Sequence, residues 1–87
     1  MIFRKSRNIE WKTVGKETII FSSSNGHFYE LNDLATFLWK CINGKRKASE
    51  IQKLVLNRFD VTESVSKTHI TQYIDTLLNK KLIEINK

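Results

Sequence analysis

The chain has 87 residues, which is enough for one small domain and too short for two. Hydrophobic residues make up 40% of the chain and charged residues 28%, a composition typical of a globular protein rather than a disordered one. Fifteen lysines and arginines against nine acidic residues give a formal net charge of +6. This excess suits nucleic acid or acidic peptide partners, and it equally suits a lysine-rich surface that serves solubility alone.

Three features of the sequence bear on the compartment of the protein. Cys41 is the single cysteine, so no disulfide can form within the chain, which suits a reducing cytoplasm. The first residues lack the apolar core of a signal peptide, and no apolar run approaches the roughly 20 residues that span a bilayer. We therefore expect a cytoplasmic protein without a membrane partner, with residues 1–8 as a flexible basic arm and residues 9–87 as a single domain.

Three short runs of β-forming residues predict an antiparallel meander. The runs are "IEWKTV" (9–14), "ETIIFSS" (17–23) and "HFYEL" (27–31). The two junctions carry glycine in the sequences "GK" and "SNG", which are typical of tight hairpin turns. In the third strand, alternation places His27 and Tyr29 on one face and Phe28 and Glu30 on the other. We expect Phe28 in the core and Tyr29 nearer a groove.

The apolar period changes to three and four residues after the third strand, which predicts helices. We expect a first helix from residue 33, a second over 48–59 and a third over 64–80. Asn32 is the expected N-cap of the first helix and Gly44 its expected C-cap, and Thr62 or Ser64 is expected to cap the third. Leu82 and the residue after it are expected to form a tail packed back on the sheet or helices.

The predicted fold class is therefore α+β: a winged-helix-like domain with a three-stranded antiparallel sheet followed by three helices. Leu31 and Trp39 are expected in its core, because large apolar residues are mostly buried.

Few residues of this chain could carry catalysis. His27 and His69 lie far apart in the sequence, and neither adjoins a carboxylate at a spacing that suggests a catalytic triad. Cys41 falls on the apolar stripe of the first helix, where burial makes a thiol inert. Two histidines and one cysteine fall short of a zinc site, and three glycines form no phosphate-binding loop. We expect a domain that binds a partner rather than catalysing a reaction, with no catalytic residues, metal or cofactor.

The stretch "GHFYELNDLATFLWKCINGKRKASEIQKLVLNRFDV", followed by "HITQYIDTLLNKKLI", resembles the PqqD-like family. The resemblance covers about residues 7–84, and its matching positions follow the order and spacing of the family pattern. They are Gly26, Phe28, Tyr29, Leu31, Asn32, Ala35, Trp39, Gly44, Glu50, Ile51, Leu54, Phe59, Asp60, Val61, Tyr73, Ile74, Leu77 and Leu82. Two positions depart from the pattern: Lys81 stands where the family usually has glycine, and Lys47 where Thr or Ser usually caps the second helix.

The resemblance implies a precursor-peptide recognition element. Such a domain holds the leader segment of a ribosomally made peptide and presents the peptide to a modifying enzyme, such as a radical SAM enzyme or, in lasso-peptide pathways, a leader peptidase. In the family the leader adds as an extra strand to the third strand and packs against the third helix. On this chain we expect the leader to contact Gly26, His27, Phe28, Tyr29, Glu30, Lys67, Ile70, Tyr73, Ile74 and Leu77.

Two features of the residues agree with this implication. A three-strand meander leaves one edge of its third strand unpaired, and such an edge can accept a peptide strand. The third helix carries the adjacent apolar pairs Tyr73-Ile74 and Leu77-Leu78, a stripe wide enough to face both the core and a groove. The alternatives are that the short strand, or the tail at 82–85, protects the edge, and that the whole stripe is buried.

Two other functions compete with peptide binding. A winged helix with this charge could bind DNA, but the third helix has no arginine and exposes Asp75 to the phosphates, so we expect no nucleic acid partner. The domain could also be a scaffold that docks an enzyme without touching its peptide. The open edge leaves the oligomeric state undecided between a monomer and an edge-paired or swapped dimer.

Overall fold

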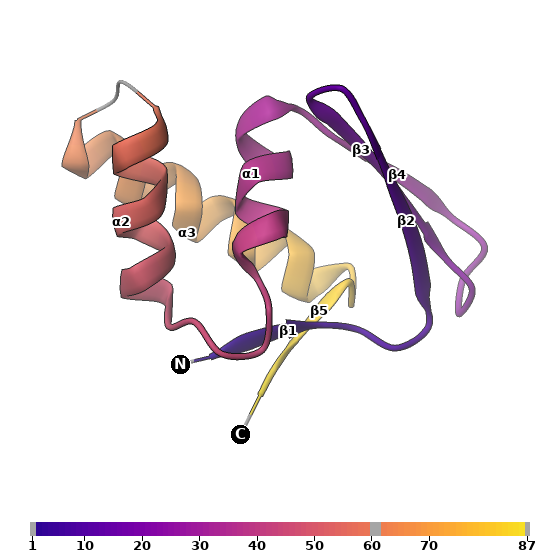
Figure 1. The fold of residues 1–87 in the computed structure, drawn as a ribbon. Coiled ribbons are helices and arrows are strands. Elements are labelled where there is room, and N and C mark those ends of the chain that lie inside the picture. The colour runs from indigo at the N-terminus through magenta and orange to yellow at the C-terminus, as the bar shows by residue number, and fades with distance from the viewer. Residues whose placement is uncertain (1, 60–61, 87) are drawn as a thin grey trace.

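The computed structural model describes residues 2–59 and 62–86, and its architecture is the predicted α+β fold. A three-stranded antiparallel sheet has the order β2-β3-β4. Its strands are β2 (Ile9–Val14), β3 (Glu17–Ser22) and β4 (Phe28–Leu31). Three helices follow: α1 (Asp33–Cys41), α2 (Ala48–Arg58) and α3 (Glu63–Asn79). In Figure 1, α1 lies between the sheet and α2, so it is covered on both sides.

The two turns of the meander form where the sequence predicts them. Gly15 has a φ of +62°, in the left-handed region that a two-residue hairpin turn requires, and Val14 pairs with Glu17 across it. Gly26 has a φ of +73° in the turn between β3 and β4, where the Asn25 side chain accepts a hydrogen bond from the amide of His27 at 2.9 Å. The glycines therefore set the register of the sheet.

Side chains and backbone carbonyls close the helix ends. Asn32 caps α1 as predicted, with its side-chain oxygen 2.9 Å from the amide of Ala35. Thr62 caps α3 through Val65 in the same way, at 3.3 Å. At the start of α2 the carboxylate of Glu50 accepts from the amide of Lys47 at 3.1 Å, which satisfies one free donor although lysine offers no acceptor of its own.

The prediction that Gly44 caps α1 is wrong. Ile42 is the C-cap, and its amide donates to the carbonyl of Trp39. Gly44 lies two residues farther on with a φ of +82°, and its amide donates to the carbonyl of Phe3 at 2.9 Å. Its conformation serves a loop that meets the N-terminal segment, which the local sequence does not reveal.

The expectation of a flexible arm over residues 1–8 is also wrong for the residues described there. Residues Phe3–Lys5 form β1, which pairs antiparallel with β5 (Ile83–Ile85). Phe3 is only 4% exposed, so burial of an apolar side chain and a set of backbone hydrogen bonds hold this segment. The tail after Leu82 is thus a strand of a second, two-stranded sheet, and it does not pair with β4.

The core gathers apolar residues from both sheets and all three helices. As predicted, Trp39 and Leu31 are buried, at 0% and 9% exposure. Phe28 contradicts its prediction, because its side chain is 69% exposed and packs on Phe21 across the outer face of the sheet, with ring centroids 4.8 Å apart. The inward face of β4 belongs to Tyr29 and its alternate neighbour Leu31.

The turn after α3 has an unusual residue in it. Lys81 has a φ of +59°, the single positive value among described non-glycine residues. The amide of Leu82 donates to the carbonyl of Leu77 at 2.9 Å and that of Lys81 to Leu78 at 3.0 Å, the two bonds of a Schellman motif. The motif normally takes glycine at this position, and a side chain there costs about 1 kcal/mol.

Candidate functional site

A groove of about 430 Å³ lies between the outer edge of β4 and the C-terminal half of α3. Apolar surface from the strand, from α1 and from α3 forms most of its lining. The lining residues are Phe28, Tyr29, Glu30, Leu31, Asn32, Ala35, Tyr73, Thr76, Leu77, Lys80 and Leu82. A groove of this size has room for side chains of an extended peptide, and it is open to solvent.

The pairing of β4 shows which of its backbone groups face the groove side. β4 pairs with β3 alone, in a register that sets Phe28 opposite Phe21 and Tyr29 opposite Ile20. The amide of Ser22 donates to the carbonyl of His27, which makes that pair a hydrogen-bonded one. Antiparallel pairs alternate in type, so the N–H and C=O of Tyr29 point toward β3.

The same alternation turns the N–H and C=O of Phe28 and Glu30 away from β3. Within residues 2–59 and 62–86 no strand pairs with this edge. Phe28 and Glu30 therefore present two donors and two acceptors at the spacing that an added antiparallel or parallel strand needs.

Two tyrosines of the groove are held in place by asparagines. The side-chain amide of Asn32 donates to the hydroxyl of Tyr73 at 3.1 Å, while its oxygen caps α1. Asn25 donates to the hydroxyl of Tyr29, also at 3.1 Å. Tyr29 in addition lies 5.0 Å from the ammonium of Lys80. Each ring thus lines the groove with its orientation set by a polar contact at its tip.

The single cysteine lies in the core and does not line the groove. Cys41 is 5% exposed, and burial raises the pKa of its thiol, so it keeps its proton. In the part of the chain that the structure describes, no three histidine, cysteine or acidic side chains gather at a spacing that could hold a metal ion. No helix of the described residues has the length and apolarity that crossing a membrane requires.

The structure brings together half of the residues predicted to contact a peptide. Phe28, Tyr29, Glu30, Tyr73 and Leu77 line the groove. Gly26 and His27 lie in the turn just before β4, where the ring of His27 is 6.3 Å from that of Tyr29.

Three predicted residues lie away from the groove. Ile70 and Ile74 are 4% and 7% exposed and belong to the core. Lys67 is exposed near the start of α3 and does not line the groove. The wide apolar stripe of α3 is thus divided: Ile70 and Ile74 face the core and Tyr73 borders the groove. Leu77, which is 3% exposed, belongs to the core and also lines the groove.

Several groove residues were missed by sequence reasoning. Thr76 follows Tyr73 at three residues, a helical spacing that would have found it once Tyr73 was chosen. Ala35 and Leu82 give no such signal, because tertiary packing alone brings α1 and the turn after α3 to the groove.

A comparison with protein families matches residues 17–83 to PqqD, described as coenzyme PQQ synthesis protein D. The chain belongs to the PqqD family. The match runs from β3 to the first residue of β5, so it includes every element that lines the groove. No curated protein matches the chain closely enough to add to this.

Two solved structures share the PqqD fold of this chain. One is TbiB1 in complex with the TbiA(beta) leader peptide, at 16% identity and a TM-score of 0.86 over 93% of this chain and 94% of that one. The other is a lasso peptide synthetase B1 complexed with the leader peptide, at 13% identity and a TM-score of 0.85 over 98% of this chain and 100% of that one. The high coverage shows that the fold extends over the strands that precede the family match. Asp60 and Val61, part of the sequence resemblance, lie outside the described residues.

Proposed function

We propose that this chain binds the leader segment of a ribosomally made precursor peptide and presents that peptide to a modifying enzyme. The observation that carries the proposal is the free edge of β4, where the backbone groups of Phe28 and Glu30 meet an apolar groove bordered by α3. Backbone hydrogen bonds at such an edge supply affinity, and pockets beside it select side chains.

The comparisons support this reading. Both similar structures are complexes with leader peptides, and the chain belongs to the same kind of fold over nearly its whole length. Membership of the PqqD family adds a second, independent line of support.

The geometry indicates which side chains of a leader would contact the groove. A strand beside Phe28–Leu31 pairs along about four residues, roughly 13 Å of extended chain. Alternate side chains of that strand face the groove, where Tyr29, Tyr73 and Leu77 offer apolar contact and Lys80 offers a charge at one end. Selectivity then depends on every second residue of the leader.

The remaining expectations follow from this role. The chain acts by binding, and catalysis belongs to the enzyme that receives the peptide, such as a radical SAM enzyme or a leader peptidase and cyclase. A reducing cytoplasm is the expected compartment, which the lone buried Cys41 suits. A monomer leaves the edge of β4 free for the leader, whereas an edge-paired or swapped dimer would compete with it.

The direct test is a titration of the chain into a fluorescein-labelled synthetic leader from the precursor encoded in its own gene cluster. Fluorescence anisotropy should show saturable binding with a Kd of about 1 μM or lower, near −8 kcal/mol. Failure to bind any leader from that cluster would contradict the proposal. Binding to duplex DNA with a steep salt dependence would instead favour the nucleic acid alternative.

A proline in β4 tests strand addition only at a residue whose N–H points away from β3. Proline at Tyr29 removes a donor that faces β3, so loss of binding there would report a damaged sheet. Proline at Glu30 removes a donor that faces outward and leaves the β3–β4 ladder intact. Glu30→Pro is therefore the variant that tests strand addition.

A further inference from the structure

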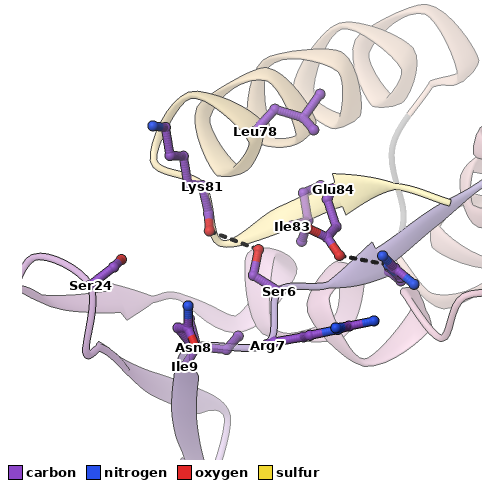
Figure 2. A pocket seen from close by; sticks show the side chains of 10 residues that line it. Ser6, Arg7, Asn8, Ile9, Ser24, Leu78, Lys81, Ile83 and Glu84 are labelled. Atoms are coloured by element: carbon purple, nitrogen blue, oxygen red, sulfur yellow. Dashed lines mark hydrogen bonds and ion pairs between the residues drawn. The ribbon is translucent and has the colours of Figure 1, made fainter.

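A second cleft, of about 580 Å³, lies on the other side of the α3 C-terminus from the groove. The end of α3, β5, the segment from β1 to β2 and the turn before β4 surround it. Its lining residues are Arg4, Ser6, Arg7, Asn8, Ile9, Ser24, Leu78, Lys81, Ile83 and Glu84. Figure 2 shows Lys81 and Leu78 on one wall, Ser24 on a second and Arg7 with Asn8 on a third. We call this the basic cleft.

The walls of the basic cleft are tied to each other by hydrogen bonds. The Ser6 hydroxyl donates to the carbonyl of Lys81 at 2.7 Å, and the Ser6 amide donates to the carbonyl of Leu82 at 3.0 Å. Arg4 and Glu84 form an ion pair at 2.7 Å across the β1–β5 ladder (Figure 2). The cleft is therefore preformed, and a ligand entering it orders little new chain.

The charge of the basic cleft is unbalanced. Three basic side chains line it, Arg4, Arg7 and Lys81, against the single carboxylate of Glu84. Glu84 is already engaged by Arg4. Within residues 2–59 and 62–86, neither Arg7 nor Lys81 has an ion-pair partner. A concave surface lined by one sign of charge concentrates ligands of the other sign.

The backbone at Lys81 points to a use for its side chain. Its left-handed conformation would be less costly with glycine, and the Schellman bonds around it need only the backbone. What lysine adds at this position is an ammonium group at the rim of the basic cleft. Strained positions of this kind tend to occur where a side chain serves binding.

Residues that line the groove are sequence neighbours of residues that line the basic cleft. Leu77 and Lys80 line the groove, while Leu78 and Lys81 line the basic cleft. At the start of β4, Tyr29 of the groove is bonded to Asn25, the neighbour of Ser24 in the basic cleft. A strand that leaves the groove at this end of β4 thus arrives at the basic cleft.

From these observations we propose that the basic cleft binds an acidic segment of the precursor peptide, immediately beside the stretch that adds to β4. The proposal rests on the proposed function and extends it to a second subsite. Arg7 pairs its guanidinium with a peptide carboxylate, for which its planar fork of donors is suited, and Lys81 supplies a second positive charge. Ser24 and Asn8 offer neutral hydrogen-bonding side chains at the same opening.

The first test compares two double variants by anisotropy titration with the labelled leader of the gene cluster. Arg7→Gln/Lys81→Gln removes both free charges of the basic cleft. Lys12→Gln/Lys53→Gln removes the same charge from exposed positions on β2 and α2 that do not line it. We expect the cleft variant to bind about fivefold more weakly and with a shallower salt dependence than the control. Equal affinities of the two variants would overturn the proposal.

The second test reverses charges across the contact. Each acidic residue of the leader that flanks the strand-adding stretch is changed in turn to lysine, and each peptide is titrated against the wild type and against Arg7→Glu. We expect one peptide to lose affinity for the wild type and to regain it with Arg7→Glu. If no peptide is rescued, Arg7 makes no specific contact and the proposal fails.

The third test uses Lys81→Gly, which relieves the backbone and removes the charge. We expect a higher Tm together with a Kd raised about twofold to threefold. A higher Tm with unchanged leader affinity would show that Lys81 serves no binding role.

These outcomes separate the two proposals. A wild type that does not bind its leader contradicts the proposed function, and with it the subsite. A wild type that binds, loses binding with Glu30→Pro and is indifferent to Arg7 and Lys81 retains the function and overturns the basic cleft alone.

Discussion

β2 and β4 are the two outer strands of the same sheet, and each leaves one row of backbone groups unpaired in the described chain. They differ in what lies beside that row. β4 borders an apolar groove completed by α3, whereas β2 sends Trp11 inward against Trp39, with ring centroids 5.9 Å apart. An open edge is suited to a peptide strand where a second surface can receive the side chains of that strand, and in this sheet β4 has such a surface.

The largest effect on leader affinity should come from proline at the edge of β4, with proline at the edge of β2 as the comparison. Glu30→Pro removes an outward N–H of β4, and Thr13→Pro removes the equivalent donor of β2, since Thr13 is paired with Thr18 between two hydrogen-bonded pairs. We expect Glu30→Pro to weaken leader binding at least tenfold, because one hydrogen bond is lost and the ring clashes with the incoming strand.

Thr13→Pro is expected to leave leader affinity unchanged, although it also loses the hydroxyl contact to Thr18 and some stability. Anisotropy titrations of both variants, with circular dichroism to verify folding, decide the matter. If Thr13→Pro weakened leader binding and Glu30→Pro did not, the leader would bind at β2.

The next effect concerns the surface that distinguishes β4. Tyr73→Ala removes the aromatic wall of the groove and makes β4 more like the bare edge of β2. We expect leader affinity to fall about fivefold, in keeping with loss of one apolar anchor. Tyr73→Phe keeps the ring and loses only an exposed hydrogen bond to Asn32, so its affinity should stay within about twofold of the wild type.

Gln72→Ala, an exposed neighbour on α3 that does not line the groove, is the matched control for Tyr73. Its leader affinity should equal that of the wild type in the same titration. An equal loss in both alanine variants would mean that the helix, rather than the tyrosine ring, had been perturbed.

On the β2 side, the expected effect is on stability rather than binding. The ammonium of Lys5 lies 5.2 Å from the ring of Trp11 and 5.1 Å from that of Trp39, and it donates to the carbonyl of Ile42. Lys5→Met should lower the free energy of unfolding by about 1 kcal/mol, as expected for loss of cation–π contacts. Urea denaturation measures this, with exposed Lys12→Met as the control that should change little.

The smallest effect is a pH dependence from the same lysine. Burial lowers the pKa of Lys5 below its ordinary value of 10.5. Between the folded pKa and 10.5 the unfolded chain therefore binds more protons than the folded one, and stability contributed by Lys5 rises with pH. The raised pKa of Cys41 acts in the opposite direction. The charge of Lys5 partly lowers that pKa, so in Lys5→Met it rises further and the variant loses more stability at high pH, which adds to the difference between the two proteins.

The stability difference between wild type and Lys5→Met should thus increase as the pH rises toward 10.5. Urea denaturation at intervals across this range checks the slope. A difference that is flat or decreases would show that the pKa of Lys5 is not lowered in the folded protein.

Much of the fold was predictable because its signals are local. Gly15 and Gly26 mark turns by their backbone freedom, and Asn32 caps α1 through a side chain that bonds three residues away. The edge of β4 was predictable as well, since a meander leaves its third strand paired on one side. Tyr73 entered the predicted site because adjacent apolar residues widen a helical stripe beyond what a core requires.

The errors share a different cause. β1 pairs Phe3 with Ile85, from opposite ends of the chain. With only three residues, β1 is too short to show the alternation of apolar and polar side chains that predicts a strand. Phe28 was assigned to the wrong face because alternation separates two faces without indicating which one the helices cover. Ile70 and Ile74 were assigned to the groove because a stripe does not show where the core ends and the groove begins.

By itself, the sequence determined the three-stranded meander with its turns, the three helices, the N-caps of α1 and α3, and the family resemblance that the comparisons confirm. All of these depend on residues near one another or on their order. Only the tertiary structure decided that the C-terminal strand pairs with β1 and leaves β4 open. It also decided that Ala35 and Leu82 help to line the groove, and that Arg7 and Lys81 line one cleft. These depend on the packing of distant segments, whose contacts arise from the burial of the whole core rather than from any local pattern.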